Sequence, residues 1–172
     1  LPYSVMNGTT QYWSRASEAG LQITGALTMG GWFNIYDLGV SRSLIQKGDV
    51  TNGYWMYRHE NNAVAFGVGT GTGFAQVATP TLPANKWTFI VARYTPSASI
   101  TLIINNASYI ATSGIPSTLQ TNTNPFVIGY NAGVGIGGYF YGNAALAFIC
   151  ASALWDSALI QLYSATRGLF GV

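Results

Sequence analysis

The sequence predicts an all-β fold, a sandwich or a barrel, from three observations. Short apolar or alternating runs separated by turn residues recur along the chain, whereas helical periodicity is nearly absent. Aromatic residues make up 14% of the 172 residues, and β-branched residues and glycines are spread evenly. No linker, block of charge or long repeat divides the chain. We therefore predict a single domain over residues 1–172, with one sizeable core.

The predicted strands follow the apolar and alternating runs. They are expected at residues 3–6, 11–15, 27–36, 43–47, 54–60, 63–68, 74–78, 87–94, 100–104, 108–111, 126–129, 139–141 and 144–151. The pairs Asn61-Asn62 and Asn105-Asn106 tolerate positive φ and indicate two-residue hairpin turns. The run from 87 to 94 is apolar at almost every position, which predicts a central strand that is covered on both faces.

One helix is predicted over residues 157–165. Leu159, Leu162 and Tyr163 recur on one face at helical spacing, and Asp156 is expected to be the N-cap. This helix is expected to close one edge of the sandwich. Cys150, the only cysteine, permits no internal disulfide, and its apolar surroundings predict a buried small hydrophobic residue.

Charge is scarce in this chain. Only 7% of residues are charged, 49% are hydrophobic, and the net charge is +2 with no basic run. A nucleic-acid-binding surface is therefore not expected. No apolar run approaches the ~18–20 residues that a membrane-spanning helix needs. A surface so poor in charge is typical of a subunit that buries neutral surface against copies of itself, so we expect a homo-oligomer or a subunit of an assembly.

Several segments, taken in order, resemble one known family. They are Met6–Trp13, Leu27–Phe33, Leu44–Gly48 with Gly53–Tyr57, Leu82–Tyr94, Ile100–Asn106, Phe126–Gly129, Tyr141-Gly142, and Ala153-Leu154 through Leu162-Tyr163. This succession is similar to the laminin G-like, concanavalin A-like lectin/glucanase jelly-roll superfamily over nearly the whole chain. The resemblance implies a two-sheet antiparallel jelly-roll sandwich with a concave sheet and one short C-terminal helix. It also implies an inward-facing Trp32, and we assign Trp32 and Trp87 to the core.

Catalysis is not expected from these residues. The glucanase branch of that family uses an E-x-D-x-x-E strand motif, which is absent, and the five acids never fall at i, i+2 or i, i+4. A Ser-His-acid triad would need His59, the single histidine, as its base, but no serine lies in a nucleophile-elbow sequence. Acids that relatives often carry are replaced here by Ala145, Leu146 and Ala158. We therefore predict a protein that is not an enzyme and has no cofactor.

A calcium site would have to be built from few ligands. Ca²⁺ usually takes 6–8 oxygens, and the available carboxylates are Asp37, Asp49 and Glu60, together with loop carbonyls and waters. Such a site is an open alternative rather than the main expectation. Two N-glycosylation sequons begin at Asn7 and Asn106, and they permit glycosylation without requiring it.

Aromatic residues are the candidates for ligand binding. A sugar stacks its apolar face on Trp or Tyr, while amides and hydroxyls bind its OH groups. Trp55 and Tyr57 share one face of a predicted strand, and with Tyr130, Tyr139 and Tyr141 they are candidates to line a glycan-binding concave face. The alternative is that these rings fill the space between the sheets or an interface.

Two functions remain open at this point. The leading hypothesis is a non-enzymatic structural or surface subunit of an extracellular or virion assembly, such as a capsid decoration, tail or fibre protein, with a possible role in glycan attachment. The alternative is a lectin-like carbohydrate-binding module that acts as a monomer or small oligomer. Both place the protein outside the cell or on a virion surface.

Overall fold

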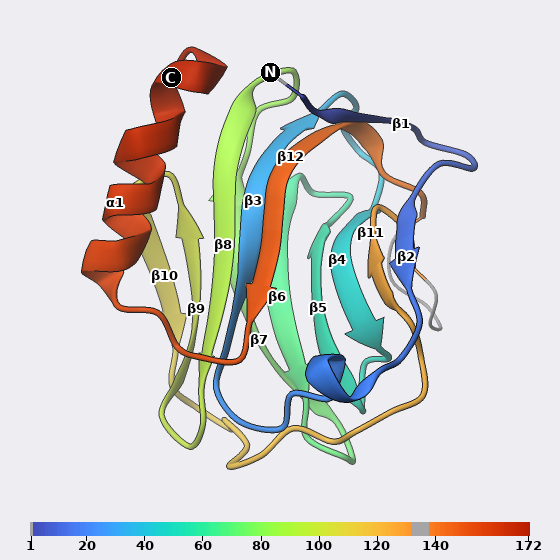
Figure 1. Ribbon diagram of the computed structural model, residues 1–172, viewed down its shortest axis with the longest axis vertical. Coiled ribbons are helices and arrows are strands. Elements are labelled where there is room, and N and C mark those ends of the chain that lie inside the picture. Colours follow the sequence, from blue (N-terminus) through green and yellow to red (C-terminus); the bar gives the residue numbers. More distant parts are fainter. Residues whose placement is uncertain (1, 132–137) are drawn as a thin grey trace.

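The computed structural model describes residues 2–131 and 138–172, which form two packed antiparallel sheets of six strands each (Figure 1). Sheet A contains, in spatial order, β1 (Ser4–Asn7), β12 (Tyr141–Cys150), β3 (Leu27–Ile35), β8 (Trp87–Thr95), β9 (Ser99–Ile104) and β10 (Ala107–Ala111). Sheet B contains β2 (Trp13–Arg15), β11 (Phe126–Ile128), β4 (Arg42–Gly48), β5 (Gly53–Arg58), β6 (Ala63–Gly69) and β7 (Phe74–Thr81). The predicted two-sheet sandwich is confirmed.

The main core lies between the two sheets. Because side chains alternate along a strand, every second residue of each strand points into this space. Met29 and Phe33 of β3 meet Met56 of β5 and Phe66 of β6 there, and all four are fully buried. This alternation explains the apolar positions that recur at intervals of two along the sequence.

A second hydrophobic cluster lies on the outer face of sheet A. Here α1 (Asp156–Thr166) and η2 (Arg167–Phe170) pack on side chains of β3 and β8 (Figure 1). The strand predicted at 87–94 is central, as expected, because β8 lies between β3 and β9. Its second face is covered by the chain's own C-terminal helix. The prediction that this helix closes an edge is therefore wrong: it covers a sheet face.

Trp32 is buried, but not between the sheets. Its ring stacks on Phe170 at 4.4 Å between centroids, and its Nε1–H donates to Thr166 Oγ1 at 2.9 Å. The expected inward orientation of Trp32 is corrected, because this indole points outward and anchors the helix. Trp87 is half-buried in the same cluster and contacts Phe170 at 4.7 Å.

The start of α1 also differs from the prediction. The N-cap is Trp155, without a side-chain capping bond, and Asp156 lies in the first turn. The carboxylate of Asp156 instead pairs with Arg93 of β8, with 2.5 Å between Oδ1 and Nη1. A guanidinium partner therefore draws this carboxylate away from the helix amides. No helix in the described ranges, 2–131 and 138–172, is long and apolar enough to cross a membrane.

The last strand is longer than predicted. Residues 139–141 and 144–151 were expected as two strands, but a single strand, β12, runs from Tyr141 to Cys150. Gly142 has φ +151° and a Cβ there would lie 2.1 Å from the Asn34 carbonyl oxygen, so this glycine allows close pairing with β3 and does not form a turn. Cys150 is partly exposed, not buried, because it lies at the strand's end.

The two asparagine pairs behave differently. Residues 105 and 106 connect β9 to β10, and Asn105 has φ +54°, so this two-residue turn is confirmed. The connection between β5 and β6 has four residues, 59–62, rather than the two that were predicted. Asn62 has positive φ there, and its Oδ1 accepts hydrogen bonds from Gly39 N–H and the Arg58 guanidinium. These tertiary contacts favour the longer turn.

A buried lysine fastens two loops to sheet B. The Nζ of Lys47 in β4 donates to Ser17 Oγ, to Asn124 O, and to both O and Oδ1 of Asn122, at 2.9–3.3 Å. Burial lowers the pKa of Lys47. The loop before η1 (Ala19–Leu21) and the loop before β11 are therefore held together by one ammonium group.

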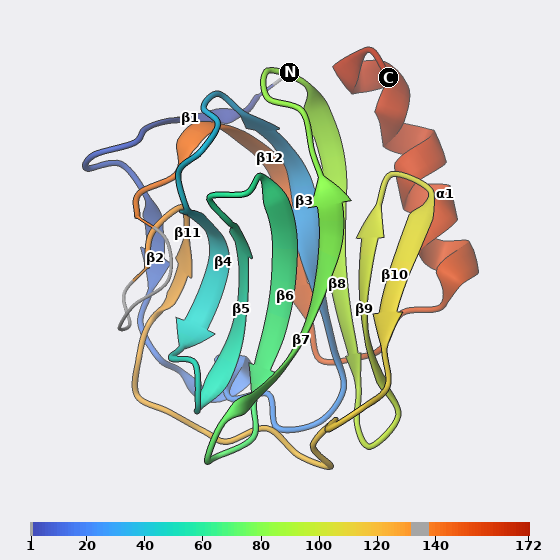
Figure 2. The same cartoon turned by 180° about the vertical axis from the view of Figure 1, so that it is seen from behind.

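The first two strands of the chain pair with two of its last strands. β1 pairs with β12, with Ser4 opposite Ala144, and β2 pairs with β11, with Ser14 opposite Val127. β1 and β2 are edge strands of different sheets, and both lie on the same side of the sandwich (Figures 1 and 2). The space between these edges positions the candidate site.

Candidate functional site

Trp13 is the centre of the candidate site. It begins β2, a three-residue edge strand that pairs with β11, and 61% of its surface is exposed. Within the described residues all three positions of this strand are exposed. Trp13 borders two open depressions that lie side by side.

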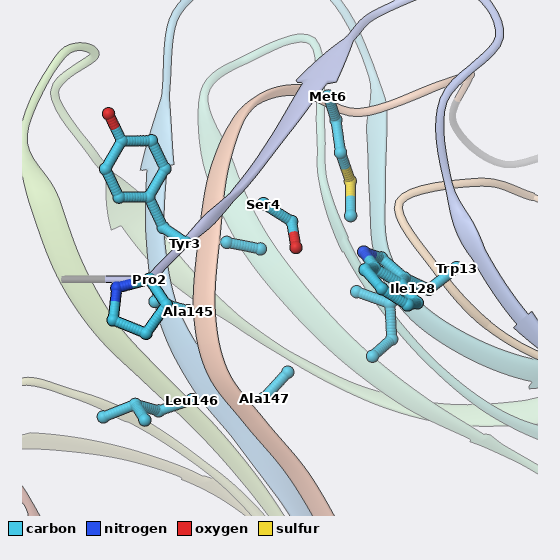
Figure 3. Close-up of a pocket in the computed structure, with 10 residues that line it drawn as sticks. Pro2, Tyr3, Ser4, Met6, Trp13, Ile128, Ala145, Leu146 and Ala147 are labelled. Atoms are coloured by element: carbon cyan, nitrogen blue, oxygen red, sulfur yellow. The ribbon is translucent and has the colours of Figure 1, made fainter.

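The first depression has a volume of about 350 Å³ and a mainly apolar lining. Figure 3 shows Trp13 and Ile128 at one end, Pro2 and Tyr3 at the other, and the Ser4 hydroxyl between them. Its floor consists of alanines and Leu146 from β12, at residues 144–147. The small floor residues leave room beside the indole.

The second depression, of about 490 Å³, is more polar. Ser4 and Trp13 border it as well, and Thr10, Gln11 and Tyr12 add hydroxyl and amide groups. None of the residues that line either depression is charged. We call the two depressions together the N-terminal groove, formed by residues 2–6, 10–13, 128 and 144–147.

The floor of the groove contains a strained backbone. The register of β12 with β3 shifts between Ala145 and Phe148, and Leu146 within this bulge has φ +50° and is half exposed. A leucine in the left-handed region costs about 1–2 kcal/mol. Bulges and strained residues concentrate next to functional sites, which supports this part of the surface as a binding site.

We expect Leu146→Gly to stabilise the isolated protein. Glycine removes the left-handed penalty and loses little packing because Leu146 is half exposed. After allowing for the greater freedom of glycine when unfolded, the gain in the free energy of unfolding is about 0.5–1 kcal/mol. Urea denaturation measures it. A loss of stability instead would mean that the leucine side chain packs more strongly than its exposure indicates.

The predicted pair Trp55 and Tyr57 does share one face, the outer face of sheet B. Both rings are buried, with Trp55 only 4% exposed. The Trp55 ring lies over Gly67, where a Cβ would approach it to 2.3 Å, and Phe74 contacts it edge-on. The remaining space beside them is about 10 Å³, which fits one water molecule but no sugar ring.

The three predicted tyrosines lie in two places. Tyr130 and Tyr139 stack at 4.4 Å, and Tyr12 of the groove contacts Tyr130 at 4.9 Å. Tyr141 lies elsewhere, edge-on to Tyr36 at 5.3 Å. Desolvation, with Tyr130 and Tyr12 nearby, raises the pKa of Tyr139. Tyr12 therefore connects one predicted tyrosine pair to the groove.

The three carboxylates considered for calcium lie in different environments. Asp37 pairs with Arg42 at 2.5 Å, and Glu60 is exposed in the β5–β6 connection. Asp49 Oδ1 accepts hydrogen bonds from Thr51 and Asn52; burial raises the pKa of Asp49, but these bonds outweigh it and lower the pKa overall. The part of the chain that the structure describes contains no group of three or more His, Cys, Asp or Glu that could hold a metal.

Both sequon asparagines are exposed. Asn7 Oδ1 accepts hydrogen bonds from the N–H groups of Thr9, Thr10 and Gln11, and its Nδ2 donates to Thr10 Oγ1. Asn106 lies in the turn between β9 and β10. Their positions permit glycosylation, which remains a prediction.

A match to a protein-family model shows the family of this chain. The model described as the concanavalin A-like lectin/glucanases superfamily, of laminin G type, matches residues 7–161. The chain belongs to this superfamily. The concanavalin A-like assignment agrees with the two six-stranded sheets and the C-terminal helix.

Solved structures of other proteins resemble this chain in fold. Domains LG4-5 of the mouse laminin alpha1 chain match with a TM-score of 0.69 and 14% identity, over 90% of this chain and 44% of that one. The binding domain of Paraclostridial Mosquitocidal Protein 1 matches with a TM-score of 0.71 and 13% identity, over 95% and 47%. The heptameric SAP-like pentraxin from Limulus polyphemus matches with a TM-score of 0.61 and 10% identity, over 88% and 80%.

This concanavalin A-like chain spans less than half the length of the first two structures. None of the curated proteins compared with it matches its sequence. At these low sequence identities the similarity shows the fold alone. It does not indicate which residues of this chain bind a ligand.

The groove residues Tyr3, Tyr12 and Trp13 were not singled out from the sequence as ligand-binding candidates. Trp13 stands in the Met6–Trp13 segment used for the family resemblance, but nothing in that segment distinguishes an exposed indole from a buried one. The available signal was weak: the apolar run around Trp13 is short and is flanked by polar residues.

Proposed function

We propose that the chain is a non-enzymatic surface domain of an extracellular or virion assembly and that it attaches to neutral glycans through the N-terminal groove. One observation carries this proposal: the exposed Trp13 lies between an apolar depression and a depression lined by neutral hydroxyl and amide groups. An indole beside neutral hydrogen-bonding groups is the combination that a sugar ring requires.

The structural neighbours support a binding role. One of the structures described above is named as the binding domain of Paraclostridial Mosquitocidal Protein 1. The pentraxin neighbour is heptameric, which supports assembly. The exposed apolar residues Leu38, Val40 and Phe74 lie outside the N-terminal groove, and in a chain with only 7% charged residues they favour burial against further copies.

We expect Trp13→Ala to weaken binding to neutral glycans on a printed array by about tenfold or more, because the stacking surface is lost. Trp13→Phe should retain most of the binding, since an aromatic face remains. Ile110→Ala is the matched control: Ile110 is equally exposed but lies on β10, at another sheet edge.

Unchanged glycan binding in Trp13→Ala, at a signal clearly above background, would remove the groove from the proposal. The alternative function, a lectin-like module acting as a monomer or small oligomer, is separated by the assembly state. Light scattering over a concentration series should show large closed or fibrous assemblies if the chain is an assembly subunit. A persistent monomer or small oligomer favours the lectin-like module instead.

A further inference from the structure

Trp155 is the most exposed of the large hydrophobic residues in the described part of the chain, at 81%. It lies between β12 and α1, where it is the helix N-cap without a side-chain capping bond. Its indole is therefore mostly in solvent and does not cap the helix. Exposed indoles of this kind are typical of binding surfaces.

The indole borders an open depression of about 540 Å³. Arg93 and Thr95 at the end of β8 form one side, and residues 153–157 form the other. Hydroxyl groups of Thr95 and Ser157 and the carboxylate of Asp156 thus lie in the same depression as the aromatic ring. This lining differs from that of the N-terminal groove because it is charged.

The carboxylate of Asp156 is held in a fixed position. Arg93 Nη1 lies 2.5 Å from Asp156 Oδ1 and also donates to the Leu154 carbonyl at 2.8 Å. The Arg93 side chain is mostly buried, whereas that of Asp156 is mostly exposed. An anchored guanidinium therefore orients a carboxylate that is mostly exposed to solvent, which reduces the entropy lost on binding a ligand.

We propose that this depression, which we call the Trp155 site, is a second glycan-binding site for neutral sugars. The apolar face of a sugar ring stacks on Trp155, and the carboxylate of Asp156 accepts hydrogen bonds from its hydroxyls. An anionic sugar is disfavoured because the exposed charge in the depression is the Asp156 carboxylate, whereas its partner Arg93 is mostly buried. The ligand class rests on the proposed function, but the site is separate. Trp13 belongs to β2 and Trp155 directly precedes α1, and these two elements lie on opposite sides of the molecule (Figure 1).

The test records the indole N–H resonances of the full chain by ¹⁵N NMR. The five tryptophans give five resonances, which single Trp→Phe variants assign. The probes are D-glucose, D-galactose, D-mannose and N-acetyl-D-glucosamine, with N-acetylneuraminic acid as the anionic sugar. We expect the Trp155 resonance to shift in a saturable way with at least one neutral probe and not with the anionic one. The buried Trp32 resonance should stay fixed.

Asp156→Asn is the decisive variant. Loss of a charged acceptor should weaken the binding that Trp155 reports by about tenfold or more, while the response of Trp13 stays the same. Ser164→Ala, on an exposed position later in α1, should change neither response.

The outcomes separate the two sites. A Trp155 resonance unmoved by all four neutral sugars overturns the Trp155 site, whatever Trp13 does. An equal response of Trp155 in Asp156→Asn and in the unchanged chain also overturns it, because the carboxylate then takes no part. A response at Trp155 without one at Trp13 supports this site and counts against the N-terminal groove.

Discussion

Trp32→Ala should destabilise the protein by about 4 kcal/mol, the cost typical of removing a large buried aromatic side chain. The Trp32 ring is fully buried between sheet A and the helix and contacts Phe170, Tyr163 and Phe89. The substitution also removes the donor to Thr166 Oγ1. Because most helical stability in proteins comes from packing, the helix should detach before the sandwich unfolds.

Chemical denaturation measures the loss of stability, and hydrogen exchange locates it. The amides of Leu159 and Tyr163, whose side chains are buried against sheet A, should exchange faster than those of β5 and β6. Trp155→Ala is the matched control and should change stability by less than about 0.5 kcal/mol, because this indole is mostly in solvent. A loss below about 1 kcal/mol for Trp32→Ala would show that α1 is held by other contacts.

We expect Lys47→Met to lower the free energy of unfolding by about 3 kcal/mol. Methionine has a similar length and no charge, so it fills the same space but cannot donate to Ser17, Asn122 or Asn124. Buried acceptors that lose their donor cost about 1–3 kcal/mol each, and Gln22 Nε2 still donates to Ser17 Oγ and Asn122 O. The expected loss therefore lies below the sum for all four acceptors.

In this variant a protease should cleave the two loops before it cleaves the strands. Limited proteolysis of Lys47→Met is expected to cut within residues 16–24 or 117–124, the two segments that the ammonium joins. Lys86→Met changes the only other lysine of the chain, which is exposed, and should leave both stability and cleavage unchanged. Equal stability of Lys47→Met and the unchanged protein would mean that water replaces the ammonium.

The strands were predictable because each one has an alternating or apolar pattern within its own few residues. Alternation within each run identified the strands that form the core, and Asn105-Asn106 marked a hairpin correctly. The prediction divided the long strand β12 at residues 142 and 143, where the close approach of Asn34 requires Gly142. The sequence contains no direct sign of such a contact between distant segments.

Which face a side chain occupies was harder to predict. Alternation along β3 separates Trp32 from Met29 and Phe33 and puts it on the face of Thr28 and Asn34. The local pattern contains no sign that a helix covers this second face and buries the indole there. The sequence also did not show which aromatic side chains are exposed to solvent. Trp55 is covered by Val50 and Phe74, whereas Trp13 is open because β2 is a short edge strand, and both differences arise from neighbours remote in sequence.

The pairing of early strands with late ones sets an order for folding during synthesis. The hairpin strands β4 to β7 and β8 to β10 find partners close in sequence, so they can form while the chain is still emerging. β1 and β2 pair with β12 and β11, which follow them by more than a hundred residues in the sequence, so this pairing forms only late in synthesis. The N-terminal groove is therefore completed only after β12 has been synthesised, and a chain interrupted before β12 would lack it even if most of its sandwich had formed.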